Sequence, residues 1–416
     1  LEGIDYPAGY VRWTERRNLE CFLDLIAREE IEVGSLISGT FPMENATAVY
    51  NDLAAGSLSA VGVLLEYPAR AADSHPPASS RTVDRGRAAS PRATGKQQLA
   101  LGFIGAGNYA SSMLLPHLAK LTTAAHLAHV ATTRSLTAVN AQRRFGFETA
   151  STSADAVLGD ESLDAIFIVT RHHTHADLVC RALETGKAVF VEKPLALTRE
   201  EVQRITETVM ATGNDRLMVG FNRRFAPLLE RMKSQFAQPG TGCVTRYLVS
   251  AGQLAADSWY LNEELEGSRF IGEGGHFIDT LSWWADSLPE EVYAISGPKR
   301  DDLQATVRFQ NGACGVITYV TTGNLRYPKE TLDAAGGGRS ARNDNFQRAT
   351  VWAGRRKSTM RSRGGQDKGQ RAELEQFLAA VRTGGPMPIS FDSLVATTRA
   401  TVAVSESLSS GRPEQV

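Results

Sequence analysis

Three short stretches carry residue types that bind phosphates, polarise oxygens or move protons. Residues 105–110 read GAGNYA and fit the pattern G-x-G-x-x-A. Residues 192–194 read EKP and place a lysine directly before a proline, and residues 272–279 read GEGGHFID and hold a histidine near a carboxylate. Together these stretches indicate a nucleotide-phosphate site beside an acid–base site.

The glycine pattern stands between an apolar run, residues 99–104, and a helical pattern over residues 111–120 with Pro116 as a possible kink. Gly105 permits a tight turn, and Gly107 lets a pyrophosphate approach the backbone because it has no Cβ. The following helix N-terminus offers free N–H groups to the phosphates. This order of strand, turn and helix predicts dinucleotide binding. The expected cofactor contacts here are Gly105, Gly107, Asn108 and Tyr109.

A second strand is expected over residues 126–132, and Thr132, Thr133 and Arg134 end it. An NAD-specific fold usually has an acidic residue here for the ribose 2′-hydroxyl, and this loop has none. The three side chains suit a 2′-phosphate instead, so the sequence favours NADP over NAD. The alternative is an ordinary loop arginine.

Residues 170–175 read TRHHTH and follow the strand expected over residues 164–169. Their spacing fits no usual zinc pattern, so we expect them to line a nicotinamide pocket and predict no metal site. The EKP lysine should also face the cofactor, because Pro194 restricts it to an extended or turn geometry at a strand end. The expected contacts in these two stretches are Thr170, His172, His175, Glu192 and Lys193.

Two groups are candidates for proton transfer. Lys193 can polarise a substrate oxygen or shuttle a proton, although a surface ion pair with Glu192 is the alternative. His276 and Asp279 are three residues apart and share a helical face, so Asp279 could orient the imidazole. On composition alone, a single helical histidine is more often structural. The predicted catalytic residues are Lys193, His276 and Asp279.

Strand and helix patterns alternate from residue 98 to residue 221, which predicts a doubly wound parallel sheet with ligands at the carboxyl ends of its strands. A second, α+β domain is expected over residues 222–416. Its strand patterns cover residues 244–250, 292–297, 305–309 and 314–321. Residues 334–366 are rich in Gly, Arg and Ser and indicate a loop and hairpin at the sheet edge. Two closing helices, at residues 368–382 and 394–408, should pack back across the domain boundary.

The composition and net charge of the chain argue against several classes of protein. The chain has 416 residues, 42% of them apolar and 22% charged, with a net charge of −1. These values favour neither a nucleic-acid partner nor a membrane surface, and no apolar run approaches the ~20 residues of a membrane helix. Four scattered cysteines suit a reducing cytoplasm. The chain starts with Leu, which suggests a fragment or a processed form.

Residues 1–66 form a separate block. Helical patterns at residues 15–28, capped by Thr14, and at residues 43–55 precede a strand at residues 60–65. The stretches RWTERRNLECFLDLIA and FPMENATAVYNDLAAG resemble the C-terminal part of zinc-dependent medium-chain alcohol dehydrogenases. The zinc ligands of that family would lie upstream, so we expect no zinc and no such activity, but a remnant of, or a cut through, a two-enzyme fusion. Residues 67–97 are rich in Pro, Ala, Ser and Arg and predict a disordered linker.

The remainder, residues 98–416, resembles the Gfo/Idh/MocA oxidoreductases. The likeness rests on GFIGAGNYA, DAIFIVTRHHTHADLVCRALETGKAVFVEKPLAL and GEGGHFID, in this order. It implies a Rossmann domain followed by an α+β domain with a large open, mainly antiparallel sheet, through which such proteins often associate as homo-oligomers. It also implies hydride transfer between a nicotinamide and a sugar, sugar nucleotide or cyclitol. By this resemblance Lys193 is the EKP lysine and His276 exchanges the proton of the substrate hydroxyl.

The resemblance also marks substrate contacts and one departure. Many members carry an aspartate four residues before the histidine, where this chain has Gly272. Either Glu273 substitutes, or Lys193 and His276 act alone, or turnover is lost and the chain is a dinucleotide-binding sensor or scaffold. A reaction that retains the cofactor, such as epimerisation, is a weaker possibility. The expected substrate contacts are Asn222, Arg223, Glu273 and Tyr260, the last by stacking on a sugar face unless it only packs in the core.

Overall fold

The computed structural model describes residues 15–28, 30–66, 96–236, 242–255, 258–299, 301–324 and 326–416. The chain divides into two compact units, residues 1–84 and residues 85–416. The expected helix cap Thr14 and most of the expected linker lie outside the described residues.

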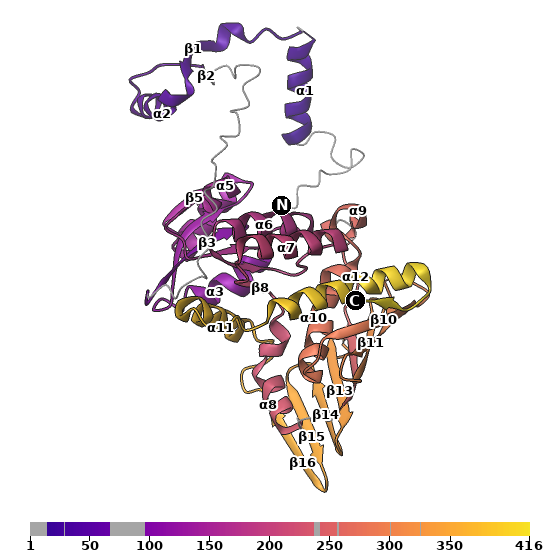
Figure 1. Cartoon of the computed structure of the whole chain (residues 1–416). Helices are drawn as coiled ribbons and strands as arrows, with labels where there is room; N and C mark the ends of the chain where they lie inside the picture. Colours follow the sequence, from indigo (N-terminus) through magenta and orange to yellow (C-terminus); the bar gives the residue numbers. More distant parts are fainter. Residues whose placement is uncertain are drawn as a thin grey trace. The chain divides into compact units, whose positions relative to one another are not determined.

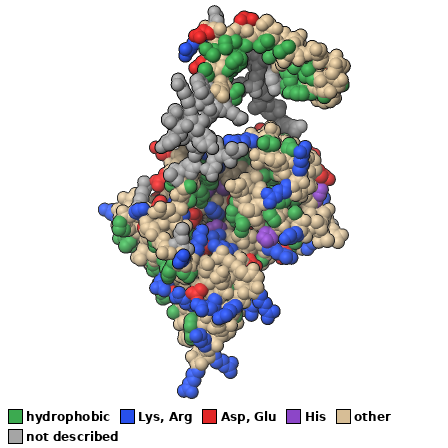
Figure 2. Space-filling model, turned by 180° about the vertical axis from the view of Figure 1, so that it is seen from behind, with side chains coloured by type: hydrophobic (Ala, Val, Ile, Leu, Met, Phe, Trp, Pro, Cys, Tyr) green, Lys and Arg blue, Asp and Glu red, His purple; other side chains and the backbone are tan. Residues whose placement is uncertain are grey.

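The first unit is a small βαβ arrangement preceded by a helix. Its strands β1 and β2 pair in parallel, and the sequence pattern missed β1, whose run ISGTFP contains Gly and Pro. Val49 is the one buried side chain among the described residues of this unit, and Figure 2 shows hydrophobic side chains open on its surface. The described part of this unit thus buries too little apolar surface for independent stability. Its elements are α1 (Glu15–Ala27), β1 (Ile37–Pro42), α2 (Ala46–Ala55) and β2 (Gly62–Glu66).

The second unit begins with the predicted parallel sheet. Six strands lie in the order β5-β4-β3-β6-β7-β8, and every neighbouring pair is parallel. The central strands are buried on both faces, which is why they read as continuous apolar runs. The strands are β3 (Leu99–Ile104), β4 (Ala125–Ala131), β5 (Thr149–Ser151), β6 (Ala165–Ile168), β7 (Ala188–Val191) and β8 (Leu217–Val219).

Helices follow the strands as the doubly wound pattern requires. The helix expected at residues 111–120 begins as a π-helical turn, Ala110–Leu114, and continues as α3 (Leu115–Leu118). Pro116 is the second residue of α3 and follows directly on the π-helical turn. The other helices of this domain are α4 (Ser135–Phe145), α5 (Ala154–Leu158), α6 (His175–Glu184) and α7 (Arg199–Thr212).

The second domain is a nine-stranded sheet in the order β16-β15-β14-β13-β9-β12-β11-β10-β17, antiparallel except for the pair β9–β12. Buried and exposed side chains alternate strictly along β11, so one face is open and the other carries helices. Figure 1 shows α8, α10 and α12 beside this sheet. These elements are α8 (Pro227–Phe236), β9 (Val244–Ser250), α9 (Glu263–Glu266), α10 (Arg269–Ala285), β10 (Pro289–Ser296), β11 (Leu303–Phe309), β12 (Cys314–Val320), α12 (Phe391–Ser410) and β17 (Glu414–Gln415).

The prediction of a loop and a hairpin at the sheet edge over residues 334–366 is correct only in part, because the two outermost strands form such a hairpin but the rest of the segment is not a loop. The chain there forms four antiparallel strands, β13 (Glu330–Gly336), β14 (Arg339–Asp344), β15 (Arg348–Ala353) and β16 (Arg356–Arg361). Small or apolar residues such as Ala341, Ala349 and Val351 face the core, and Arg and Ser side chains alternate with them. Because the alternating Arg and Ser residues resemble the composition of a loop, the sequence pattern did not predict the strands. Figure 2 shows basic side chains at the tip of this sheet.

The two closing helices join the domains, as predicted. Phe377 of α11 (Gln370–Thr383) is fully buried, with its ring 5.5 Å from Phe167 and 5.6 Å from Phe190 of the parallel sheet. Helix α12 contributes Leu394 to the core of the first domain and Ala403 to that of the second. The position of the second domain over the sheet therefore depends on this packing.

Replacement of Phe377 by alanine should lower the free energy of unfolding by about 3–5 kcal/mol, because it leaves a cavity where three aromatic rings meet. Urea denaturation of the full chain measures this. Leu136→Ala, at a side chain that is 71% exposed, is the control and should change stability by less than about 0.5 kcal/mol. Equal effects of the two substitutions would show that α11 does not hold the domains together.

Candidate functional site

The glycine turn after β3 has the geometry that a phosphate site needs. Gly105 has φ +96°, and a Cβ there would clash with the carbonyl oxygen of Val169, so no other residue fits. At Gly107, by contrast, a Cβ would meet no atom within 4 Å. Gly105 is therefore required by the protein's own backbone, whereas Gly107 leaves open space beside the turn.

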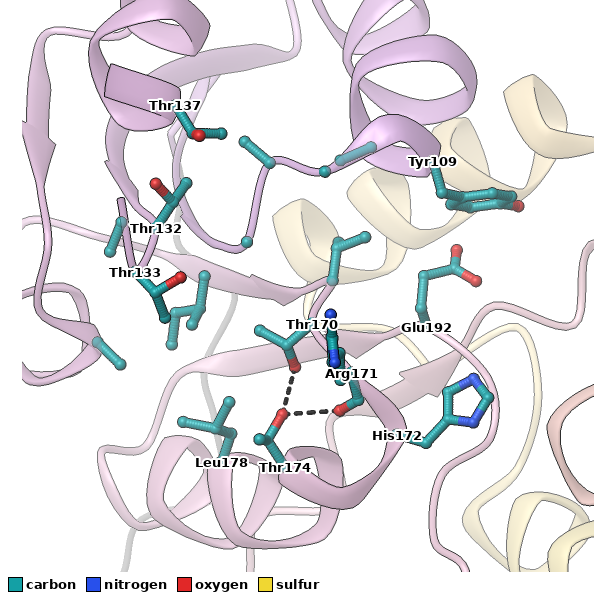
Figure 3. Close-up of a pocket in the computed structure, with 18 of the residues that line it drawn as sticks. Tyr109, Thr132, Thr133, Thr137, Thr170, Arg171, His172, Thr174, Leu178 and Glu192 are labelled. Atoms are coloured by element: carbon teal, nitrogen blue, oxygen red, sulfur yellow. Dashed lines mark hydrogen bonds between the residues drawn. The ribbon is translucent and has the colours of Figure 1, made fainter. Parts of the chain in front are cut away.

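A cavity of about 940 Å³ lies at the carboxyl ends of β3, β4, β6 and β7. This is the position at which doubly wound sheets bind ligands. Figure 3 shows Thr132 and Thr133 at one end of the cavity and His172 and Glu192 at the other. The predicted cofactor contacts among its lining residues are Gly105, Gly107, Asn108, Tyr109, Thr132, Thr133, Arg134, Thr170, His172, Glu192 and Lys193.

The loop after β4 offers hydroxyl groups and a guanidinium to this cavity. Thr132, Thr133 and Arg134 all line it, and the Thr132 hydroxyl donates a hydrogen bond to the carbonyl oxygen of Arg134 at 2.7 Å. The carboxylates among the cavity-lining residues are Asp177 and Glu192, and neither belongs to this loop. This end of the cavity is thus suited to a negatively charged group.

The loop after β6 forms the opposite wall. The Thr174 hydroxyl donates to the carbonyl oxygen of Arg171 at 2.8 Å and lies 2.6 Å from the Thr170 hydroxyl, as Figure 3 shows. The Nδ1 atom of His172 lies 3.0 Å from the carbonyl oxygen of Glu266. Burial lowers the pKa of His172 to about 3, so its imidazole is neutral at physiological pH.

The prediction that His175 contacts the cofactor is wrong in this structure. His175 is fully buried and does not line the cavity. Its Nδ1 lies 2.7 Å from the carbonyl oxygen of Pro194, and burial lowers its pKa to about 4. Its ring supports the turn that carries Lys193, a role that residue spacing could not reveal.

Lys193 reaches the cavity wall as an ammonium group. Its Nζ donates a hydrogen bond to the Tyr260 hydroxyl at 2.9 Å. Burial alone would lower the pKa of Lys193, but it is raised, because Tyr260 and Glu273 favour the charged form. The alternative of a surface ion pair is excluded, since Lys193 is largely enclosed and its hydrogen bond goes to Tyr260.

Glu192 is a buried carboxyl group at the same end of the cavity. Burial raises its pKa to about 7, and the neighbouring Lys193 only partly opposes this. Its Oε1 has no hydrogen-bond partner in the described part of the protein. Glu373 of α11, also buried, has a raised pKa because of burial and the proximity of Glu192. The pair thus places two carboxyl groups with raised pKa values at this end of the cavity, and one of them, Glu192, lines it.

The prediction that Asp279 orients His276 is wrong. Arg224 donates to both carboxylate oxygens of Asp279, at 2.8 Å from Nε and 2.5 Å from Nη2. Both side chains are buried. The Nδ1 of His276 has no hydrogen-bond partner among the described residues, and burial lowers its pKa well below the usual value. Asp279 is therefore half of a structural ion pair.

The predicted substrate contacts separate into two groups. Tyr260 lines the cavity, whereas Asn222, Arg223 and Glu273 are absent from its wall. Arg223 pairs with buried Glu330 at 3.2 Å, and Lys368 pairs with the same carboxylate at 2.6 Å. Arg223 and Lys368 both lower the pKa of His276 and so lie in its electrostatic environment.

Sequence reasoning missed several residues of this region. Thr137 and Leu178 line the cavity, and Glu330 organises the cationic group beside His276. No motif marks them. Among the described residues, no three His, Cys, Asp or Glu side chains are grouped to hold a metal ion. None of the described helices is long and apolar enough to span a membrane.

A parallel doubly wound sheet with a glycine turn and a cavity at its strand ends defines the class of Rossmann dinucleotide-binding folds. Residues 99–221 match the Gfo/Idh/MocA family, described as "Oxidoreductase family, NAD-binding Rossmann fold". This match confirms the resemblance to that family for this part of the chain.

Curated relatives carry names of sugar and cyclitol dehydrogenases. Levoglucosan dehydrogenase of Pseudarthrobacter phenanthrenivorans is 29% identical over 218 residues, which cover 43% of this chain and 55% of the relative. The scyllo-inositol 2-dehydrogenase (NAD(+)) of Bacillus subtilis is 31% identical over 197 residues, with 42% and 54% covered. The D-xylose 1-dehydrogenase (NADP(+)) 2 of Haloferax volcanii is 26% identical over 280 residues, with 64% and 84% covered. The chain spans about half the length of the first two relatives.

Solved structures support the fold of both domains. A levoglucosan dehydrogenase in complex with NADH and levoglucosan superposes with a TM-score of 0.67 at 22% identity, covering 77% of this chain and all of that one. The fold is therefore a Rossmann-like parallel sheet joined to a mainly antiparallel open sheet, as predicted. The resemblance of residues 1–66 to alcohol dehydrogenases stays a prediction.

Replacement of Glu192 by glutamine should change how stability depends on pH. The carboxyl pKa is raised from its ordinary value of 4.5 to about 7, so the folded state holds a proton that the unfolded state has lost in this range. Stability of the unaltered chain then falls as pH rises from 4.5 to 7, by up to about 3 kcal/mol, and the glutamine variant lacks this loss.

Urea denaturation at pH 5 and pH 7.5 measures the difference, with Glu161→Gln at an exposed carboxylate as the control. If the stability difference between Glu192→Gln and the unaltered chain is the same at both pH values, the pKa of Glu192 is not raised.

Proposed function

We propose that the chain is an NAD(P)-dependent oxidoreductase that transfers hydride to or from a sugar, sugar nucleotide or cyclitol. The observation that carries the proposal is one continuous cavity that runs from the glycine turn to an enclosed lysine ammonium. The names of the curated relatives support the choice of substrate class. The alternative, a dinucleotide-binding scaffold without turnover, would explain the glycine turn but not the lysine ammonium in the cavity wall.

The residues present fit a dinucleotide. Open space at Gly107 would admit the pyrophosphate, and the backbone N–H groups that follow would bind it. The Thr132–Arg134 loop would hold the adenosine ribose, and Thr170, His172 and the unpartnered Oε1 of Glu192 would face the nicotinamide end. When bound, the dinucleotide supplies the hydride donor or acceptor.

Lys193 supplies a fixed positive charge to the reacting oxygen. Its ammonium is half-buried in the cavity wall, where it would polarise a carbonyl or stabilise the alkoxide that forms from a hydroxyl. By the family resemblance, His276 exchanges the proton of the substrate hydroxyl. Its side chain does not line the cavity, and burial lowers its pKa well below the usual value, which makes the imidazole a weak base, so the resemblance alone supports that role.

We also propose that NADP is preferred over NAD. The loop after β4 presents two hydroxyls and one guanidinium and no carboxylate, which suits a 2′-phosphate. The relatives carry both NAD and NADP in their names, so this chain's own loop is what supports the choice.

Three further points of the same proposal concern the setting of the enzyme. Exposed Tyr293, Ile295 and Trp352 lie on β10 and β15 of the nine-stranded sheet, which supports homo-oligomers formed through its open face. Free cysteines among the described residues support a reducing, cytoplasmic location. Residues 1–66 would be the remnant of an alcohol-dehydrogenase-like partner.

Replacement of Gly107 by aspartate should abolish binding of both NADH and NADPH, because a carboxylate would occupy the space meant for phosphates. Fluorescence and calorimetric titration of the purified chain measure this. Gly364→Asp places the same side chain in open space on a loop and should leave both affinities unchanged. Failure of the unaltered chain to bind either dinucleotide would overturn the proposed function.

Replacement of Arg134 by alanine should weaken NADPH binding about tenfold, or 1.4 kcal/mol, with little change for NADH. The guanidinium would contact only the 2′-phosphate, which NADH lacks. Arg143→Ala, at an exposed arginine of α4, is the control. Equal losses for the two dinucleotides would show that this loop does not select NADP.

A further inference from the structure

The position of Gly272 is occupied by side chains from elsewhere in the chain. A Cβ at Gly272 would lie 2.5 Å from the Tyr260 hydroxyl oxygen and 2.8 Å from Cε1 of His172. Both distances are shorter than carbon contacts allow, so no carboxylate can stand at this position while Tyr260 keeps its place. The hydroxyl of Tyr260 thus fills the space of the aspartate that the family resemblance led us to expect.

Tyr260 comes from a different element than the residue that it replaces. It belongs to the short 3-10 helix Trp259–Leu261, between β9 and α10, whereas Gly272 lies in α10. Tyr260 and Lys193 both line the cavity, and their polar atoms are 2.9 Å apart. Neither Glu273 nor His276 lines it. The hydroxyl that a ligand in the cavity meets beside the lysine is therefore that of Tyr260.

Neighbouring rings hold Tyr260 in one orientation. The His172 ring is almost perpendicular to the Tyr260 ring, and the two ring centroids are 4.7 Å apart. The Trp259 ring is also 4.7 Å from the Tyr260 ring, and the angle between these two ring planes is 51°. His172 is itself fixed by the carbonyl oxygen of Glu266. The hydroxyl is consequently pre-positioned against Lys193 rather than free to turn towards solvent.

Burial, more than the surrounding charges, favours a protonated hydroxyl on Tyr260. Glu192, Glu273 and Arg269 are the charged neighbours of the pair, and Arg269 and Glu273 lie 3.6 Å apart. His172 and His175 are neutral because burial lowers the pKa of each. Burial also raises the pKa of Tyr260, although Lys193 opposes this, so the phenol keeps its proton at neutral pH.

We propose that Tyr260 is a catalytic residue whose hydroxyl, paired with Lys193, exchanges a proton with the reacting oxygen of the substrate. The inference rests on the proposed function. In the reducing direction, the carbonyl carbon gains hydride from the bound dinucleotide, and the oxygen takes the proton of the Tyr260 hydroxyl. The Lys193 ammonium then returns a proton to the phenolate, and the resulting amine regains one from water. Oxidation of a hydroxyl follows the reverse order.

The first test measures the pKa of Lys193 in the protein without cofactor. Lysine acetylation by acetic anhydride is followed across pH 6–11 by mass spectrometry of peptides, in the full chain and in Tyr260→Phe. The variant keeps the ring but loses the acceptor that stabilises the ammonium, so the pKa of Lys193 should fall. A fall of one pKa unit means about a tenfold larger reactive amine fraction at pH 8. Tyr293→Phe, on the open sheet, is the control and should leave Lys193 unchanged. A Lys193 pKa that is the same in Tyr260→Phe as in the unaltered chain would overturn the proposal.

The second test measures turnover. With levoglucosan, inositols and xylose as probes, Tyr260→Phe should lower kcat at least 100-fold and leave the dinucleotide Kd within twofold. Gly272→Ala should cause a similar loss, because its methyl group displaces the Tyr260 hydroxyl. A kcat within threefold of the unaltered chain in either variant would overturn the proposal. Absence of dinucleotide binding by the unaltered chain would overturn the proposed function instead, and the labelling result would still stand by itself.

Discussion

A buried ammonium group is unstable unless acceptors and opposite charges replace the water that it has lost. Lys193 meets this condition at the end of β7 through the Tyr260 hydroxyl and the nearby carboxylates Glu273 and Glu192. The two histidines beside it stay neutral, so they add no repulsion. The cavity can therefore present a fixed positive charge from a half-buried position in its wall, where such a charge can act on a reacting oxygen.

This arrangement depends on the packing of the second domain against the first. Tyr260, Glu273 and the carbonyl of Glu266 all come from the chain after residue 222, whereas Lys193 and His172 belong to the parallel sheet domain. Helix α11 contributes side chains to the core of the first domain, and helix α12 contributes side chains to both cores, so the two helices fix the domains relative to each other. The Arg199–Glu406 pair, at 2.8 Å, adds a polar contact between α7 and α12. The electrostatics of the site are thus a consequence of apolar packing some distance away.

Local sequence predicted what is local in the structure. The glycine turn, the loop after β4 and the EKP lysine each lie next to a strand whose apolar run is easily recognised, and all three line the cavity. The errors concern partners that are far apart in the chain. Asp279 binds Arg224, 55 residues away, and His175 supports Pro194, 19 residues away, so neither follows from spacing within a motif. Strands β13–β16 were missed because their solvent-facing positions are mostly Arg, Asp and Ser.

Gly272 shows why the departure from a family pattern has to be judged in three dimensions. Read along the sequence, a glycine in place of a carboxylate suggests lost chemistry, or a substitution by the adjacent Glu273. In the folded chain, Glu273 lies 3.6 Å from Arg269 and outside the cavity wall, while a tyrosine twelve residues earlier fills the vacant space and bonds to the lysine. What the site requires is a proton-bearing group that touches both Lys193 and the cavity. A phenol from the loop before α10 meets that requirement as well as a carboxylate on α10 would, and the glycine is what makes room for it.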